Sequence, residues 1–201
     1  MWTASLPSPP LSLLQTQWLS LPGSLTRALR AQGDFQLAVL HEGHTLPAAD
    51  EAQALGVPLD TSCWLREVLM SVNGTPAVLG RSLTPDHPGA HAWQDVRTLS
   101  STPLGVLLYE DPRITRTAFE YAQPHARHPI AQLAHRSIPL PEPRRSTTHT
   151  QQSAPSGHAA QANPQTLLWA RRSLFRLQQE PLLVSECFLP GLWKIAQPPA
   201  A

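Results

Sequence analysis

Residues 64–83, WLREVLMSVNGTPAVLGRSL, carry the clearest structural signal in the sequence. Two largely apolar runs flank Asn73-Gly74, a dipeptide typical of a two-residue β-hairpin turn because both turn residues must adopt a positive φ. The runs 64–72 and 77–83 are therefore predicted to pair as antiparallel strands. This hairpin indicates a fold built on an antiparallel sheet.

The expected register of this hairpin places two arginines opposite each other. Residues equidistant from a two-residue turn face one another, so Arg66 should face Arg81 on a surface that also carries Val68 and Leu79. Two guanidinium groups on a mostly apolar face need an anionic partner. Two interpretations stay open. Acidic side chains or solvent at the sheet edge satisfy the pair, or the arginines bind a carboxylate or phosphate of a ligand.

A second hairpin is predicted near the C-terminus from the runs 173–177 and 182–189. Glu186 lies among apolar residues on one face of its second strand, and the turn expected at Gln179-Glu180 places it opposite Ser173. A lone carboxylate in an apolar stripe is either paired with an arginine or has a raised pKa. Both situations are typical of functional sites, although a structural ion pair produces the same pattern.

Capping residues and apolar periodicity place the remaining elements. The helix that begins at Thr102-Pro103 has first-turn N–H groups without partners inside the helix, which makes a general anion seat, and Gly105 leaves room for close approach. Hairpins with a few helices, and no long βαβ alternation, predict a single α+β domain in which helices flank an antiparallel sheet. The other expected elements are a helix at 25–32 with Ser24 as N-cap, a strand at 35–42, and a helix at 111–121.

One domain with a long insertion is the expected organisation. Residues 123–163 hold six of the 22 prolines and five of the nine histidines but only four bulky aliphatic residues. Such a segment buries too little apolar surface to offset its ordering entropy, so it is predicted to be disordered. Its histidine spacing fits no compact ligand pattern, and no metal site is predicted. The domain is expected over 21–122 and 164–192, between a Pro-rich segment (1–20) and a tail (193–201).

The composition excludes several classes of protein. The 201 residues carry a net charge of +1 at pH 7, which excludes a strongly basic nucleic-acid-binding arm. No apolar run approaches the ~18 residues of a membrane span, and no basic residue precedes the short N-terminal leucine cluster as in a signal peptide. Cys63 and Cys187 are too few for a disulfide framework and are predicted to be reduced. We therefore expect a cytoplasmic monomer with no nucleic-acid partner and no stable membrane insertion.

The chain also carries a set of short motifs. They are WLRE (64–67), GTP (74–76), LGR (79–81), TPLG (102–105), WARRS (169–173) and PLLVSECFLP (181–190). Taken together and in this order, they resemble the chorismate pyruvate-lyase family of bacterial ubiquinone biosynthesis. The resemblance implies an antiparallel sheet with flanking helices that enclose a ligand cavity. It also implies the first step of that pathway, conversion of chorismate to 4-hydroxybenzoate and pyruvate, without a metal or organic cofactor.

The resemblance assigns roles to individual residues. Arg66 matches the arginine that holds the ring carboxylate, and Leu104 matches the residue whose backbone amide meets the ligand. Glu186 matches the glutamate near the ring hydroxyl, so Glu186 and Arg66 are the expected catalytic residues. Leu25 falls where the family can carry Met beside the ligand. Arg81 matches the family's Gly-Arg and is expected to bind the second carboxylate.

Two alternatives to a lyase remain. Ligand-sensing domains of some bacterial transcription regulators resemble the same fold, so the chain is alternatively a non-catalytic domain that binds an aromatic carboxylate. An adaptor that binds partners through its Pro/His-rich segment is the other alternative, with 139–145 as a weak polyproline candidate. The segment 123–163 departs from the family, which usually has a short link there, and the similarity weakens before Leu21.

Overall fold

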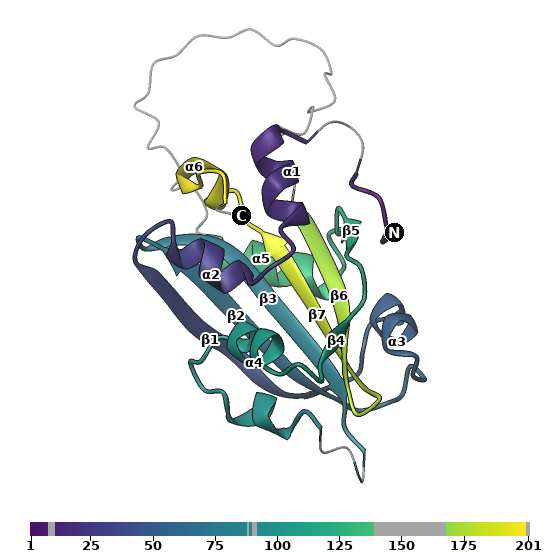
Figure 1. The fold of residues 1–201 in the computed structure, drawn as a ribbon. Coiled ribbons are helices and arrows are strands. Elements are labelled where there is room, and N and C mark those ends of the chain that lie inside the picture. The colour runs from purple at the N-terminus through teal and green to yellow at the C-terminus, as the bar shows by residue number, and fades with distance from the viewer. Residues whose placement is uncertain (8–10, 88, 90–91, 139–167, 200–201) are drawn as a thin grey trace, which may run out of the picture.

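One antiparallel sheet of seven strands forms the framework of the protein (Figure 1). The computed structural model describes residues 1–7, 11–87, 89, 92–138 and 168–199. The strand order is β1-β2-β3-β7-β6-β4, and β5 also pairs with β6. The strands are β1 (Phe35–Thr45), β2 (Cys63–Val72), β3 (Thr75–Pro85), β4 (Thr115–Arg116), β5 (Glu120–Ala122), β6 (Trp169–Leu177) and β7 (Glu180–Phe188).

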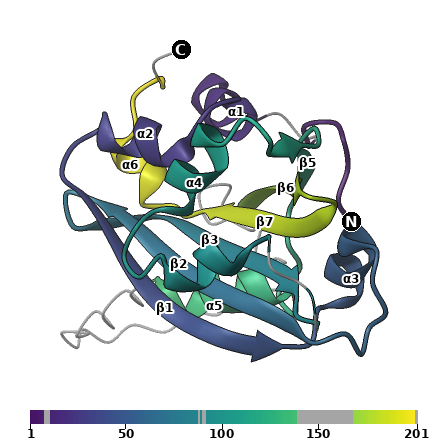
Figure 2. The same ribbon diagram turned by 60° about the horizontal axis from the view of Figure 1, so that its bottom comes forward.

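Helices cover both faces of this sheet, which confirms the expected α+β fold. Figure 2 shows α1, α2, α4 and α6 on one side of the sheet and α5 on the other. On the same face as α5, Leu55 of α3 packs with Leu83 and Leu183. The helices are α1 (Leu13–Ser20), α2 (Leu25–Arg30), α3 (Ala49–Leu55), α4 (Leu104–Glu110), α5 (Pro129–Ser137) and α6 (Leu192–Ile195), with a 3₁₀ turn at Gln94–Thr98.

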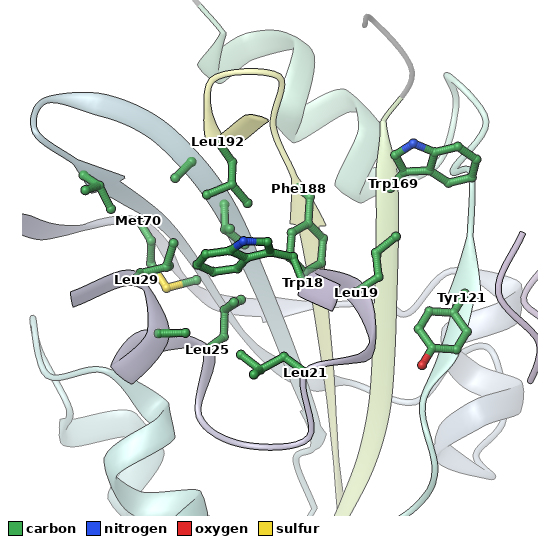
Figure 3. Close-up of a cluster of buried hydrophobic side chains, with 14 residues drawn as sticks. Trp18, Leu19, Leu21, Leu25, Leu29, Met70, Tyr121, Trp169, Phe188 and Leu192 are labelled. Atoms are coloured by element: carbon green, nitrogen blue, oxygen red, sulfur yellow. The ribbon is translucent and has the colours of Figure 1, made fainter. Parts of the chain in front are cut away.

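The N-terminal segment belongs to the core of the domain, contrary to the expected boundary at residue 21. Trp18 and Leu19 of α1 are fully buried in the apolar cluster drawn in Figure 3. A capping box, in which Ser12 and Gln15 bond each other's backbone, starts α1 and was overlooked beside the prolines. The tail is also packed, because Trp193 stacks on Phe188 in the same region.

The first hairpin has its turn where expected but a different register. Asn73 and Gly74 both have positive φ, as a two-residue turn requires. A bulge beside Pro76, which has no N–H to donate to the ladder, then shifts the pairing by one residue. Arg81 consequently faces Glu67, and Ser82 faces Arg66. The expected Arg66–Arg81 pair is wrong, because a one-residue slip moves a side chain to the other face.

The second hairpin differs from its expected register by two residues. Its turn lies at Gln178 and Gln179, both with positive φ. Glu186 therefore pairs with Arg171, and Val184 takes the place opposite Ser173. A shift of two preserves the faces of a strand, so Glu186 keeps the face that the sequence assigned to it.

Two other expected elements change. Residues 111–121 are not helical, because Asp111 accepts a hydrogen bond from the Arg113 amide in a local turn and the short strands β4 and β5 follow. The N-cap of α4 is Pro103, one residue later than expected.

The predicted disordered insertion contains a packed helix. Pro129 stands at the first position of α5, and the His128 side chain accepts a hydrogen bond from the Ile130 amide. Ile130, Ala131 and Ala134 are fully buried. The few apolar residues suffice because they fall on one helical face. Disorder is thus the wrong prediction for 123–138, and 139–163 lies outside the described residues.

Candidate active site

A cavity lies between α2, α4 and the sheet. Its volume is about 60 Å³. Its position matches Figure 2, where α2 and α4 lie over the same face of the sheet. The lining residues come from all these elements: Leu25, Thr26, Leu37, Arg66, Val68, Met70, Gly80, Ser82, Pro103, Leu104, Gly105, Leu108, Tyr109, Phe119, Ser173, Phe175, Val184 and Glu186.

The floor of the cavity follows from strand register. One row across the sheet runs from Arg66 through Ser82 and Val184 to Ser173. The next row runs from Val68 through Gly80 and Glu186 to Arg171. A Cβ at Gly80 would lie 3.0 Å from Cγ2 of Val68, so a larger residue here would crowd the floor of the cavity. The register thus distributes polar groups over both ends of an apolar floor.

Arg66 provides the buried cation of the site. Its side chain is 2% exposed; Nε donates to Glu42 Oε1 at 2.9 Å. Nη2 donates to the carbonyl oxygens of Ser100 at 2.6 Å and Thr102 at 3.2 Å, which ties the arginine to the loop before α4. Within the described residues Nη1 has no acceptor. One face of the guanidinium is therefore held rigidly while another donor remains for an anion.

The start of α4 forms the roof of the cavity. Leu104 is the first residue of the helix, and Leu104 and Gly105 both line the cavity. A Cβ at Gly105 would lie 2.9 Å from Oγ of Ser24, the N-cap of α2, so glycine permits the two helix starts to approach closely. Arg66 donates to the Thr102 carbonyl two residues before the helix, so the first-turn N–H groups of α4 lie near this arginine.

Glu186 is held by an arginine that the sequence reasoning missed. Arg171 is 1% exposed, and its Nε donates to Glu186 Oε2 at 2.5 Å. Its Nη1 donates to the carbonyls of Trp18, Leu19 and Leu21 at 3.3, 3.2 and 2.8 Å. This pair fixes one carboxylate oxygen of Glu186 and links the N-terminal helix to the site. The doublet Arg171-Arg172 was a visible signal, but only the register could match Arg171 to Glu186.

Tyr109 is a second residue that the sequence reasoning missed. Its hydroxyl donates to the Gly23 carbonyl at 3.1 Å and accepts from Arg116 Nη1 at 3.2 Å. Burial raises the pKa of Tyr109 above its usual range, so its side chain is neutral at pH 7. It links the last turn of α4 to Gly23, the residue before the N-cap of α2, at the edge of the cavity.

Arg81 lies on the other face of the sheet and does not line the cavity. It donates to Glu51 at 2.7 and 3.1 Å and to Glu67 at 2.6 Å, and all three side chains are buried. Burial alone would lower the pKa of Arg81, but the two glutamates raise it above its usual value. The expected role of Arg81 in substrate binding is therefore wrong, and acidic side chains satisfy it as the first interpretation of the arginines proposed.

The structure brings the other expected residues together. The same cavity is lined by residues from four separate elements: Leu25, Arg66, Leu104 and Glu186. Neither cysteine lines it. Burial raises the pKa of the Cys63 thiol to about 11 and that of Cys187 to about 12, so neither is a reactive thiolate at pH 7.

Comparisons with known proteins support one family. A family model described as chorismate lyase matches residues 1–197. The chain belongs to the chorismate lyase family. A probable chorismate pyruvate-lyase 1 of Pseudomonas entomophila (strain L48) is 39% identical over 197 residues, which cover 98% of this chain and 93% of that protein. A probable chorismate pyruvate-lyase of Bordetella pertussis is 38% identical over 200 residues, which cover 100% and 94%.

Two solved structures resemble the chain at low sequence identity. PhnF from Mycobacterium smegmatis has a TM-score of 0.49 at 16% identity, covering 83% of this chain and 64% of that chain. The C-terminal domain of the histidine utilization repressor from Pseudomonas syringae pv. tomato has a TM-score of 0.49 at 11% identity, covering 84% and 98%. No helix in the described parts of this chain is long and apolar enough to cross a membrane.

Proposed function

We propose that the protein is a lyase that converts chorismate to 4-hydroxybenzoate and pyruvate. The proposal rests on two groups that line the same cavity. One is buried Arg66, which has an unused donor, and the other is Glu186, which Arg171 holds in place. Membership of the chorismate lyase family and the names of the two relatives agree with this activity.

Arg66 and the backbone N–H of Leu104 bind the ring carboxylate of the substrate. A charged donor and a helix start together compensate a carboxylate that is removed from water. Leu25 contacts the ligand from α2 through apolar bulk. These contacts hold the ring in one orientation, and orientation is the main requirement of an elimination that is driven by aromatisation.

Glu186 acts at the carbon that bears the ring hydroxyl. In the reaction the C–O bond to the enolpyruvyl group breaks, a ring proton is lost, and its electron pair completes the aromatic ring. The departing enolpyruvate is then protonated to pyruvate. Glu186 is the carboxylate among the described cavity-lining residues. Its carboxylate accepts a hydrogen bond from the ring hydroxyl or takes up the ring proton.

Only neutral donors accompany Arg66 in the described lining of the cavity. With Arg81 bound by glutamates on the other face, the enolpyruvyl carboxylate meets hydroxyl and amide groups rather than a second guanidinium. The reaction requires no nucleophile and no cofactor, because positioning and matched charge suffice.

The product, 4-hydroxybenzoate, indicates the pathway in which the protein acts. 4-Hydroxybenzoate is the aromatic precursor expected from the family's role, so we infer that the protein catalyses the first step of ubiquinone biosynthesis in the cytoplasm, as a monomer. A strain that lacks the gene should need added 4-hydroxybenzoate to make ubiquinone. Gel filtration of the purified chain tests the monomer.

The experiment that separates a lyase from a binding domain is incubation with chorismate. A lyase consumes chorismate and releases equal amounts of 4-hydroxybenzoate and pyruvate. A binding domain of the same fold gives saturable binding of 4-hydroxybenzoate with no loss of chorismate. The first result supports the proposal, and the second overturns it.

A further inference from the structure

Ser173 contributes an unsatisfied hydroxyl to the cavity. It lies on β6, lines the cavity and is 3% exposed. Its Oγ has no hydrogen-bond partner among the described residues. Native proteins rarely leave a buried hydroxyl without a partner, because the lost hydration is not replaced. The hydroxyl therefore calls for a partner that the protein chain does not supply.

Ser173 is the unsatisfied buried group that lies in the cavity, among the described residues. Among the described residues three further buried side-chain atoms lack a partner, and none of their residues lines the cavity: Gln17 Oε1, Trp64 Nε1 and Trp193 Nε1. A ligand in the cavity can satisfy Ser173 and cannot satisfy these three.

Ser173 and Glu186 are diagonal neighbours on the cavity face of the second hairpin. Ser173 pairs with Val184, and Glu186 lies two residues further along β7. Diagonal neighbours on one face of an antiparallel pair lie about 7–8 Å apart. Glu186 accepts a hydrogen bond from Arg171, and none joins it to Ser173. This spacing is compatible with a single ligand oxygen that hydrogen-bonds to both side chains.

We propose that Ser173 Oγ donates a hydrogen bond to the ring hydroxyl of the ligand, while that hydroxyl donates its proton to a hydrogen bond with Glu186. This inference rests on the proposed function, because it uses the ligand orientation set by Arg66. A carboxylate only accepts and a hydroxyl both donates and accepts, so the three groups satisfy one another. Ser173 and Glu186 together then select a ligand with a hydroxyl para to the carboxylate held at Arg66.

The test compares two ligands on three proteins by titration calorimetry. Benzoate lacks the hydroxyl of 4-hydroxybenzoate and is otherwise the same. Ser173→Ala should weaken 4-hydroxybenzoate binding about 3–10-fold, the effect of one neutral hydrogen bond, and leave benzoate binding within about twofold. Ser185→Ala is the matched control, since Ser185 is equally buried on the same hairpin but does not line the cavity. It should change neither affinity.

Several outcomes overturn the inference. Equal weakening of both ligands by Ser173→Ala means that the residue shapes the cavity and does not recognise the hydroxyl. Unchanged binding of both ligands, with a lower melting temperature, means that its role is structural. Failure of the proposed function has a different signature, namely no product from chorismate with the wild-type protein, and leaves these binding comparisons intact.

Discussion

Arg66 is the residue whose removal tests the binding end of the cavity. Arg66→Ala should weaken 4-hydroxybenzoate binding by about 2–5 kcal/mol, the range for truncating one partner of a buried charged pair. Isothermal titration of the folded variant measures this loss. Its melting temperature should be reported beside it, because the variant also loses the hydrogen bonds to the loop before α4.

Arg81→Met is the control for this prediction. It removes the same group from the other face of the sheet and leaves Glu51 and Glu67 buried without their cation. The expected result is a loss of about 3–5 kcal/mol in the free energy of unfolding, with binding by the folded protein unchanged. If the variant bound 4-hydroxybenzoate more weakly but was as stable as the wild type, Arg81 would belong to the binding site. That result would contradict the account based on strand register.

Glu186→Gln separates chemistry from binding. The amide keeps one acceptor oxygen but neither carries a charge nor takes a proton at neutral pH. Turnover of chorismate should fall by roughly 10²–10⁴, while 4-hydroxybenzoate affinity changes much less because Arg66 still holds the carboxylate. Stability should fall by about 1–3 kcal/mol, since Arg171 loses a charged acceptor. Near-normal turnover in a steady-state assay would remove Glu186 from the mechanism.

The residues of the site differ in how much of the fold must be known before each one can be predicted. Glu186 was found from the sequence because a carboxylate in an apolar strand stripe depends only on side-chain alternation. Arg66 and Leu104 came from the resemblance. Arg171 was missed because it depends on which residues face each other across the second hairpin, and register is not visible in one strand. Ser173 was placed on the correct face beside Glu186, but nothing in the sequence marked its hydroxyl as unpaired.

At the scale of elements, the turn of the first hairpin was predictable, whereas the position of the second turn and both registers were not. The dipeptide Asn73-Gly74 located its turn because few other residues accept positive φ twice in succession. The bulge beside Pro76 then reassigned Arg81 to the other face. The helix α5 was missed because its segment is rich in proline and histidine, although four small or aliphatic residues on one face are enough to pack it against the sheet.

The helix α5 should be required for stability. Ile130 is fully buried against the sheet face opposite the cavity, so Ile130→Ala should lower the free energy of unfolding by about 2–4 kcal/mol through lost burial and a cavity. Gln132→Ala, at an exposed position of the same helix, should change it by less than about 0.5 kcal/mol. Urea denaturation of both variants measures the difference. Equal stabilities would indicate that α5 contributes nothing to the core.

At the scale of the whole molecule, Asp50 joins three distant parts of the chain. It accepts hydrogen bonds from Trp2 at 2.6 Å, from His128 at 3.2 Å and from Arg172 at 3.0 Å. Partial burial would raise the pKa of Asp50, but these partners, His128 foremost, lower it to about 2. The N-terminal segment, α5 and β6 therefore share one carboxylate.

This low pKa predicts how stability depends on pH. A carboxyl group whose pKa is lower in the folded than in the unfolded state stabilises the fold above its ordinary pKa of 3.8, and the contribution is lost as pH falls toward about 2. The stability difference between wild type and Asp50→Asn should thus shrink as the pH falls from about 4 to 2. Urea titrations across this range measure it. A difference that does not shrink on acidification would contradict the lowered pKa.

The central claim is that this cavity turns chorismate over, and the most direct test follows both products with wild-type protein and Arg66→Ala in parallel. The account predicts many turnovers by the wild type, with 4-hydroxybenzoate and pyruvate in equal amounts, and a loss of at least about 30-fold in kcat/KM for the variant, from the ~2 kcal/mol lower bound on the Arg66 contact. Binding of 4-hydroxybenzoate by the wild type without any loss of chorismate would contradict the account, and so would equal turnover by the two proteins.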